Sequence, residues 1–212
     1  MRHERKYKVD DINLAVVKQV LRLHPASFRP LYPDRQINNI YFDSPDLTTY
    51  RENVNGISER KKFRLRWYGD DIRQIENPRF EIKKKSNQLG SKEILPVAAF
   101  SLDALENVTA EVNRLSRNTA ALRPRLINAY RRSYFGTSDG RFRITIDEQV
   151  HYFSLLTARR FTRFNISDPA IIVELKYDAE EDGDSVQKVM QHLPFRQTKS
   201  SKYVNGVNMT AY

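Results

Sequence analysis

Residues 62–68 read KFRLRWY, a stretch in which basic and apolar side chains alternate. Successive side chains of a β-strand point to opposite faces of the sheet. The stretch therefore predicts a strand that presents aromatic and aliphatic side chains on one face and two arginines, Arg64 and Arg66, on the other. The rest of the fold can be predicted by working outward from this two-faced strand.

Most of the other predicted strands repeat the pattern of one apolar face and one charged, mainly basic face. In RFEIKK, two apolar residues alternate with Glu81 and Lys83, and in IIVELKY two alternate with Glu174 and Lys176. The predicted strands cover residues 4–9, 36–42, 62–68, 79–84, 124–135, 141–147 and 171–177.

Helices are predicted between groups of strands. The first starts at Asp10 and Asp11 and ends before Pro25, and a second starts with Ser44 as its N-cap and Pro45 in the first helical position. Apolar residues at helical spacing predict three more, over residues 101–117, 184–193 and 200–212. Runs of strands with helices inserted at intervals indicate an α+β fold.

Two arrangements explain strands with one charged face. An antiparallel sheet with one face on a core and the other in water produces the same alternation. Alternatively, roughly eight strands could close into an antiparallel β-barrel with the charged faces inward and helices packed outside. The concentration of arginine on these faces favours the barrel, because solvent-facing strands more often carry Thr, Ser, Gln and Glu.

Composition limits the class of protein. The 212 residues fit a single domain over 1–212, and 36 Lys and Arg against 26 Asp and Glu give a net charge of +10. This balance predicts a polyanionic partner. The absence of cysteine excludes disulfides, zinc–thiolate sites and thiol nucleophiles. No apolar run is long enough for a membrane span or a secretory signal, so we expect a cytoplasmic protein.

Competing functional motifs are missing or weak. The sequence has neither a Walker-type phosphate loop nor a Gly-x-Ser-x-Gly nucleophile motif, and its four histidines lack metal-ligand spacing. Eleven Tyr and eleven Phe beside many Arg are compatible with base stacking in RNA. Because no ribonucleoprotein-type motif accompanies them, nucleic acid is not the expected partner.

An ordered set of short motifs resembles the triphosphate tunnel metalloenzymes, and within them the catalytic domain of the vacuolar transporter chaperone (VTC) complex, which makes polyphosphate. The most specific is the basic strand FRLRWYG at residues 63–69. The others are IYFD at 40–43, FEIK at 80–83, YRRSYF at 130–135, RITID at 143–147, VELK at 173–176 and KSSKY at 199–203.

The resemblance implies a closed β-tunnel, a divalent metal (Mn²⁺ or Mg²⁺) and a nucleoside triphosphate as phosphoryl donor. By motif position, the implied catalytic residues are Lys6, Arg64, Arg66, Lys83, Arg132, Arg143 and Glu174. The implied substrate-binding residues are Lys92, Tyr130, Lys199 and Lys202. Glu174 matches the family's principal metal ligand, and Glu4 is its expected helper.

One departure from the wider family bears on activity. Other tunnel enzymes begin with Glu-x-Glu-x-Lys, whereas this chain has Arg2 at the first glutamate position, followed by Glu4 and Lys6. Loss of one carboxylate argues against a two-metal triphosphatase and favours transfer of phosphate from ATP to inorganic polyphosphate or a pyrophosphate primer. The alternatives are a triphosphatase built on the same tunnel and a non-catalytic polyphosphate-binding module.

Overall fold

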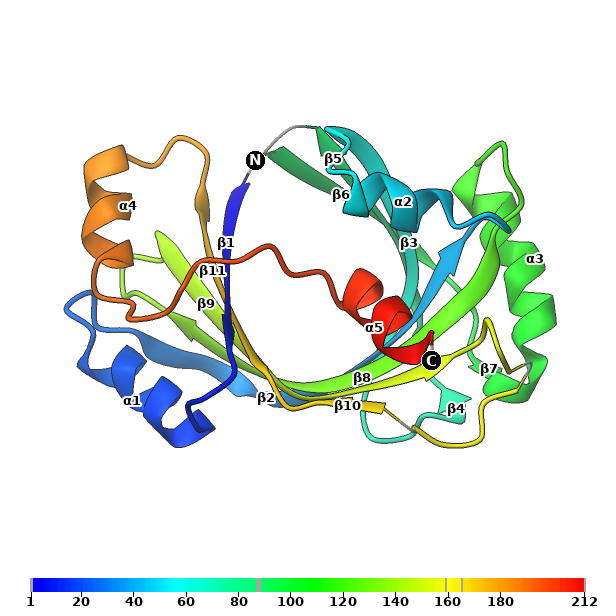
Figure 1. The fold of residues 1–212 in the computed structure, drawn as a ribbon, viewed down its shortest axis with the longest axis horizontal. Coiled ribbons are helices and arrows are strands. Elements are labelled where there is room, and N and C mark those ends of the chain that lie inside the picture. The colour runs from blue at the N-terminus through cyan, green and yellow to red at the C-terminus, as the bar shows by residue number, and fades with distance from the viewer. Residues whose placement is uncertain (1, 87–88, 159, 165, 212) are drawn as a thin grey trace. The chain divides into compact units, whose positions relative to one another are not determined.

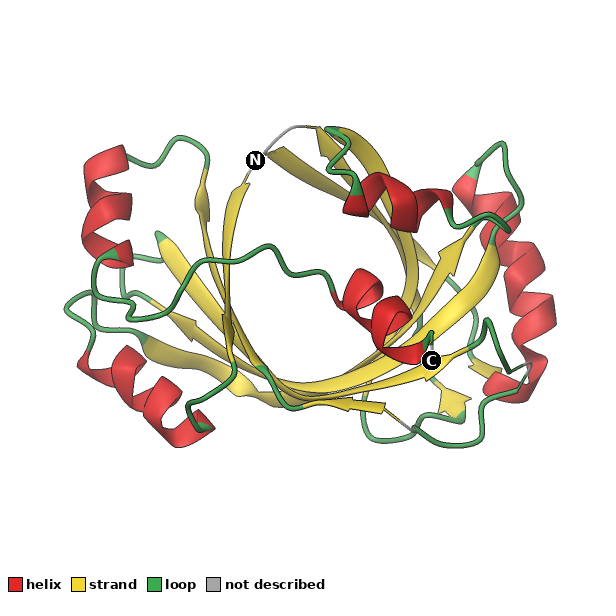
Figure 2. Cartoon of the chain, viewed as in Figure 1, coloured by secondary structure: helices red, strands yellow, loops and turns green. Residues whose placement is uncertain are grey.

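Strands and five α-helices make up the computed structural model, which describes residues 2–86, 89–158, 160–164 and 166–211 (Figures 1 and 2). The strands are β1 (Arg2–Val9), β2 (Arg29–Asp43), β3 (Glu59–Tyr68), β4 (Gln74–Ile75), β5 (Arg79–Ser86), β6 (Leu89–Pro96), β7 (Phe100–Ser101), β8 (Arg123–Gly136), β9 (Phe142–Ser154), β10 (Ile166–Asp168) and β11 (Ile171–Asp178). The helices are α1 (Leu14–Leu23), α2 (Thr48–Val54), η1 (Leu102–Ala104, a 3₁₀ turn), α3 (Leu105–Ser116), α4 (Gly183–Met190) and α5 (Lys202–Thr210).

Nine strands form one sheet in the order β10-β9-β11-β1-β6-β5-β3-β2-β8, and β4 pairs with β7. A further pairing of β8 with β9 closes eight of the nine into a hydrogen-bonded ring. The β1–β11, β11–β9, β2–β3, β3–β5 and β5–β6 pairs are antiparallel. This topology confirms the predicted α+β class with a closed antiparallel barrel of about eight strands.

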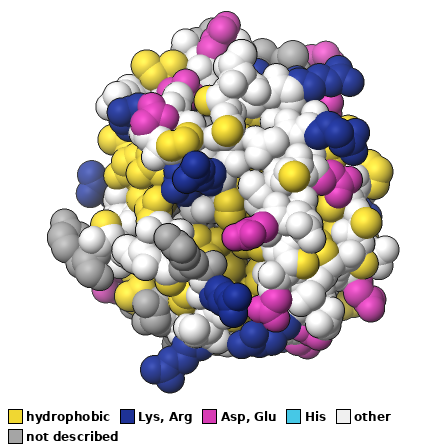
Figure 3. All heavy atoms as spheres, turned by 90° about the vertical axis from the view of Figure 1, so that its right-hand side faces the viewer, with side chains coloured by type: hydrophobic (Ala, Val, Ile, Leu, Met, Phe, Trp, Pro, Cys, Tyr) yellow, Lys and Arg dark blue, Asp and Glu magenta, His cyan; other side chains and the backbone are white. Residues whose placement is uncertain are grey.

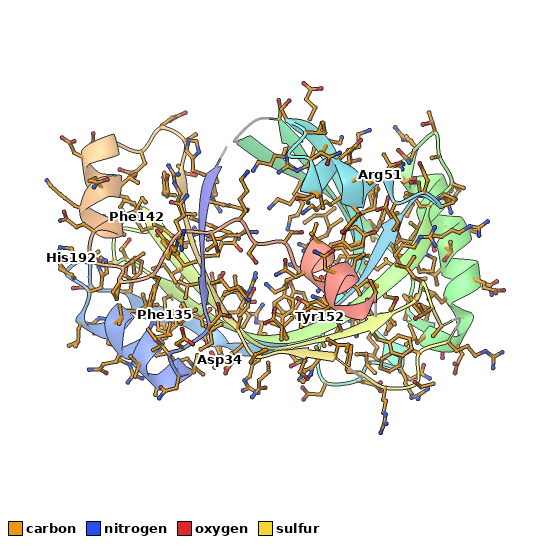
Figure 4. All side chains as sticks on the ribbon, in the orientation of Figure 1. Asp34, Arg51, Phe135, Phe142, Tyr152 and His192 are labelled. Carbon is orange, nitrogen blue, oxygen red and sulfur yellow. The ribbon has the colours of Figure 1, made fainter. Side chains whose placement is uncertain are left out.

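The chain divides into two compact units, each with its own core. The first comprises Met1–Arg35, Arg131–Val150 and Asp168–Ser200. In its core, Val17 and Leu21 of α1 and two valines of α4 pack on apolar residues of β1, β9 and β11. Phe135 and Phe142, labelled in Figure 4, belong to this core. These helices therefore cover the apolar face of the sheet.

The second unit comprises Gln36–Tyr130, His151–Ser167 and Ser201–Tyr212. Its core is formed by apolar residues of β2, β3 and β5 together with Val108 and Val112 of α3. Phe63, Leu65 and Trp67 all lie in this core, as the alternation in KFRLRWY predicts. Their burial leaves the arginines of the same strand on the opposite face.

Helices α1 and α2 begin later than predicted, although the hydroxyl of the predicted cap Ser44 accepts from the amide of Thr48 at 3.0 Å. The side chain of Asn13 accepts from the amide of Val16, so α1 begins at Leu14 and not at Asp10. The buried carboxylate of Asp43 accepts from the amides of Thr49 and Tyr50 at 2.9 Å each, so α2 begins at Thr48 and not after Ser44. A carboxylate that satisfies two helix N–H groups is a stronger cap than the serine hydroxyl.

Helix α5 packs on the polar side of the second unit. The ring of Tyr203 stacks on that of Tyr41 with centroids 5.2 Å apart, and its hydroxyl donates to Asp43 at 2.7 Å. A Cβ on Gly206 would lie 2.5 Å from Cδ1 of Tyr152, the residue labelled beside α5 in Figure 4. Glycine at this position therefore lets α5 lie directly on the sheet.

The structure contains strands that the sequence patterns did not predict. Strand β6, which pairs with β5, has the sequence LGSKEILP, in which apolar and polar residues do not alternate strictly. Strands β10, β4 and β7 are too short to show a periodic pattern. Strands β2 and β9 also extend beyond their predicted ends. No helix of the described residues is both long and apolar enough to cross a membrane.

Candidate functional site

The sheet of the second unit has a strongly basic face opposite its core. Register places Arg64 between Tyr41 and Glu81, and Arg66 between Asn39 and Arg79, on neighbouring strands. Cross-strand partners share one face, and so do residues two apart along a strand. We call this the basic face; its cations are Arg60, Lys62, Arg64, Arg66, Arg79, Lys83, Lys85 and Lys92.

Glu81 is the carboxylate around which these cations gather. Its oxygens lie 2.5 Å from Nη2 of Arg64, 3.2 Å from Nζ of Lys92 and 4.0 Å from Nη1 of Arg66. The residue is only 2% exposed. Burial by itself raises the pKa of Glu81, but the charges of Arg64, Arg66 and Lys92 outweigh burial and hold the pKa at about 2. One anion thus positions three cations and neutralises only part of their charge.

The pKa of Glu81 predicts a loss of stability in acid. Its ordinary value is 4.5, and the folded value is about 2. A lowered folded pKa stabilises the protein above pH 4.5, and that contribution is lost as the pH falls from 4.5 toward 2. We expect the free energy of unfolding to drop by about 2 kcal/mol between pH 5 and pH 3 through this group.

Denaturant titrations at the two pH values, on the native protein and on Glu81→Gln, measure that contribution. The variant should show a pH dependence smaller by this amount, because glutamine does not titrate. Equal pH dependence in both proteins would contradict the role assigned to Glu81.

Arg66 is held by neutral partners. Its Nε donates to Oδ1 of Asn39 at 2.9 Å, and its Nη2 donates to the hydroxyl of Tyr130 at 3.0 Å. The ammonium of Lys202, the first residue of α5, lies 4.4 Å from the centroid of the Tyr130 ring. The structure therefore brings together three predicted site residues, Arg66, Tyr130 and Lys202. Neutral partners fix the guanidinium in place without cancelling its charge.

The row of lysines next to Glu81 includes one that the motif comparison missed. In register, Lys83 stands between Lys62 and Lys92, so three cations cross three strands side by side. Lys62 donates to Oγ of Ser201, the N-cap of α5, at 2.8 Å. Lys62 precedes Arg64 by two residues, so strand alternation alone could have identified it as a residue of the same face. Alternation along residues 79–83 puts Arg79 on the same face as Glu81 and Lys83, and register adds that it is the partner of Arg66.

The first unit has a polar face of mixed charge. Glu4 pairs in register with Lys176, which pairs with Arg143, and Lys6 pairs with Glu174. A carboxylate oxygen of Glu174 lies 3.1 Å from Nζ of Lys176, two residues along the same strand. The predicted residues Glu4, Lys6, Arg143 and Glu174 are therefore close neighbours on three adjacent strands.

Glu4 and Glu174 offer oxygen ligands to a divalent cation. They occupy diagonal positions on paired strands, a separation that long side chains can span. Next to Glu174 in register is Thr145, whose buried Oγ1 has no hydrogen-bond partner among the described residues. The described residues contain no group of three or more His, Cys, Asp or Glu that could hold a metal. This donor set fits a Mg²⁺ or Mn²⁺ ion that takes its remaining ligands from substrate phosphates and water, not a closed protein cage.

Arg132 is the most firmly held of the predicted site residues in the first unit. Its Nε and Nη2 donate to the two carboxylate oxygens of Asp147 at 2.5 and 2.7 Å. Asp147 is completely buried. Sequence alternation placed Asp147 on the charged face but did not identify it as the partner that orients Arg132.

Three cations of the first unit differ in how they are held. The ammonium of Lys6 donates to the backbone oxygen of Ser200 at 3.1 Å. Arg143 and Lys199 are exposed, and within the described part of the chain neither side chain makes a hydrogen bond or ion pair. The structure therefore brings Arg143 next to the other predicted residues without fixing its side chain, and it leaves Lys199 in the loop before α5.

The side of the second unit that carries α3 shows charges of both signs (Figure 3). On the side that carries α3, Lys and Arg side chains are interspersed with acidic and hydrophobic ones (Figure 3). The basic face gathers cations on neighbouring strands in register, and it is therefore the candidate anion-binding surface of this unit.

The sequence also matches a known protein family. A sequence model of the VTC domain family matches residues 1–211, nearly the whole chain. None of the curated proteins matches the sequence.

Solved structures with the same fold are distant in sequence. A candidate adenylate cyclase from Vibrio parahaemolyticus is 12% identical, with a TM-score of 0.54 over 96% of this chain and 97% of that one. A protein from Pyrococcus horikoshii is 11% identical, with a TM-score of 0.52 over 99% of each chain. A candidate adenylyl cyclase from Hippeastrum, which has a dominant triphosphatase activity, is 12% identical, with a TM-score of 0.54 over 98% of this chain and 96% of that one. Such identities establish a shared fold and no more.

Proposed function

The chain belongs to the VTC domain family, and from this membership we propose that it transfers the γ-phosphoryl group of ATP to the terminal phosphate of a growing polyphosphate chain. The basic face carries the proposal: it holds eight cations on three neighbouring strands, and three of them lie within 4.0 Å of the buried carboxylate of Glu81. A polyanion such as a triphosphate or polyphosphate is the ligand that this excess of fixed positive charge suits.

The proposed reaction needs no protein nucleophile. A terminal phosphate oxygen of the acceptor attacks the γ-phosphorus of ATP, the bond from that phosphorus to the bridging oxygen breaks, and ADP leaves with the bonding electrons. The acceptor phosphate is ionised at neutral pH, so it requires little help from a general base. Catalysis then consists of positioning the two phosphates and stabilising charge spread over the transferred group.

Fixed guanidinium groups suit this task. Arg64 is anchored by Glu81, and Arg66 by Asn39 and Tyr130, so neither has to reorganise when charge develops. Arginine also binds phosphate with two donors at once, whereas Lys83 and Lys92 act as point charges. We assign phosphate binding to these residues of the second unit. For Lys6, Arg132 and Arg143 of the first unit, the same role is proposed from their positions in the family motifs.

Glu174 and Glu4 would hold the divalent cation. When bound, such a cation neutralises phosphate charge in the ground state and in the transition state. In the protein itself, Lys176 lies 3.1 Å from a carboxylate oxygen of Glu174, and Lys6 is the register partner of Glu174 on β1. Lys199 and Lys202 are assigned to binding of the polyphosphate chain, as the family motif implies.

Triphosphate hydrolysis is the second candidate function. It is favoured by the fold that the chain shares with the Hippeastrum protein, which has a dominant triphosphatase activity. Water would take the place of the acceptor phosphate, and the same cations would bind the substrate.

A ³¹P NMR time course tests the proposal. Purified protein is incubated with ATP, Mn²⁺ and a pyrophosphate primer, and the expected result is a growing signal from internal-chain phosphates together with ADP. Orthophosphate without internal-chain signal would move the assignment to a hydrolase. An unchanged spectrum, with polyphosphate binding intact, would identify a binding module.

A further inference from the structure

Two tyrosines and an arginine form an exposed cluster in the first unit. The rings of Tyr32 (β2) and Tyr134 (β8) meet edge to face, with centroids 5.7 Å apart. The guanidinium carbon of Arg35 lies 5.5 Å from the centroid of Tyr32 and 5.8 Å from that of Tyr134. Tyr32 is 54% exposed, which is unusual for so large an apolar side chain in a strand. The cluster thus shows aromatic surface and a planar cation to solvent.

The backbone that carries Tyr32 is rigid. Pro30 and Pro33 flank it in β2, and each proline fixes its own φ. The neighbouring Leu31 lies so close to Gly136 of β8 that a Cβ on this glycine would be 2.9 Å from Cδ1 of Leu31. The backbone at Tyr32 is therefore restrained before any ligand arrives, which reduces the ordering entropy lost when one binds.

The cluster continues the line of predicted phosphate-binding residues on β8. Tyr134 follows Arg132 by two residues in one strand, so both side chains project from the same face, about 7 Å apart along the strand. Tyr130, the partner of Arg66, precedes Arg132 by the same spacing. Tyr134 and its ring partners therefore lie two residues along β8 from Arg132, a predicted phosphate-binding residue. The sugar and base of a nucleotide whose phosphates bind Arg132 would lie there.

We propose that Tyr32, Arg35 and Tyr134 form a subsite that stacks the base of the nucleoside triphosphate donor. The proposal rests on the function proposed above, because it takes Arg132 to bind the phosphates of the same nucleotide. Aromatic rings and guanidinium planes both stack on the face of a nucleobase, and they tolerate different bases because every base has a π-face. Inorganic triphosphate, which has no base, gains nothing from this subsite.

Isothermal titration of two ligands tests the subsite without relying on turnover. ATP and inorganic triphosphate are each titrated, with Mg²⁺ present, into the native protein, Tyr32→Ala and Tyr32→Phe. For Tyr32→Ala we expect the Kd of ATP to rise about tenfold, within the range for one stacked base, while the Kd of inorganic triphosphate changes by less than about twofold. Tyr32→Phe keeps the ring and should bind ATP as the native protein does.

Each result has a distinct meaning. Equal changes for both ligands, or no change for either, would overturn the base subsite and leave the proposed function standing. If the native protein binds neither triphosphate, the proposed function itself fails. An unchanged melting temperature, expected for so exposed a position, establishes that Tyr32→Ala is folded.

Discussion

Replacing Glu174 with alanine should reduce Mn²⁺-dependent formation of ADP from ATP by roughly a hundredfold or more, because the variant loses the carboxylate that we propose as the principal ligand of the cation. Polyphosphate binding should remain measurable, since the cations of the basic face are untouched. ADP release followed by a coupled assay, and polyphosphate binding followed by filter retention, measure the two properties separately.

Glu93→Ala is the matched control for this experiment. Glu93 is a carboxylate in β6 that pairs with Lys84, and each of the two side chains is 49% exposed. Its removal should leave ADP formation unchanged. If Glu174→Ala forms ADP within about twofold of the native rate, Glu174 is not required for catalysis. A melting temperature equal to that of the native protein would show that any loss is not caused by unfolding.

Replacing Arg132 with alanine should lower the free energy of unfolding by about 3–5 kcal/mol. The reason is the buried carboxylate of Asp147, which would lose both donors that it now receives from Arg132. Removing two charged donors from a buried carboxylate costs much more than the pair itself contributes. Urea titrations monitored by circular dichroism give the free energy directly.

The double variant Arg132→Ala/Asp147→Asn separates loss of the pair from loss of the arginine. A neutral amide should recover a large part of the stability, because it is less costly to bury than a carboxylate that has lost its two donors from Arg132. A double variant that is less stable than Arg132→Ala would contradict this account. Both Arg132→Ala and the double variant should also bind triphosphate less tightly, because each lacks the guanidinium that we propose binds phosphate.

Much of the fold could be predicted from local patterns. The alternation in KFRLRWY correctly placed Phe63, Leu65 and Trp67 in a core and the arginines on the other face. The same reasoning succeeded for β1, β5, β9 and β11. It failed at β6, whose residues do not alternate strictly, and at the starts of α1 and α2, where capping side chains set the boundary.

The candidate site was predicted as a set of residues but not as a set of contacts. Motif order named Arg64, Arg66, Lys92 and Tyr130, and the structure joins the first three through Glu81. Glu81 itself was seen only as one member of an alternating strand. Its place at the centre of the basic face depends on how β3, β5 and β6 align. The register between strands cannot be read from the sequence of a single strand.

Side-chain alternation is a property of each strand, because every peptide unit reverses the direction of the next side chain. The amino-acid sequence alone therefore specified which residues face a core and which carry charge, and its family motifs supplied the order of the strands that bear them. Pairing is a property of several strands together. Which carboxylate meets Arg64 or Arg132, which lysines form a row, and which tyrosines share Arg35 depended on distant segments coming into register. Their identities follow from the free energy of the packed sheet and not from the pattern of any single segment.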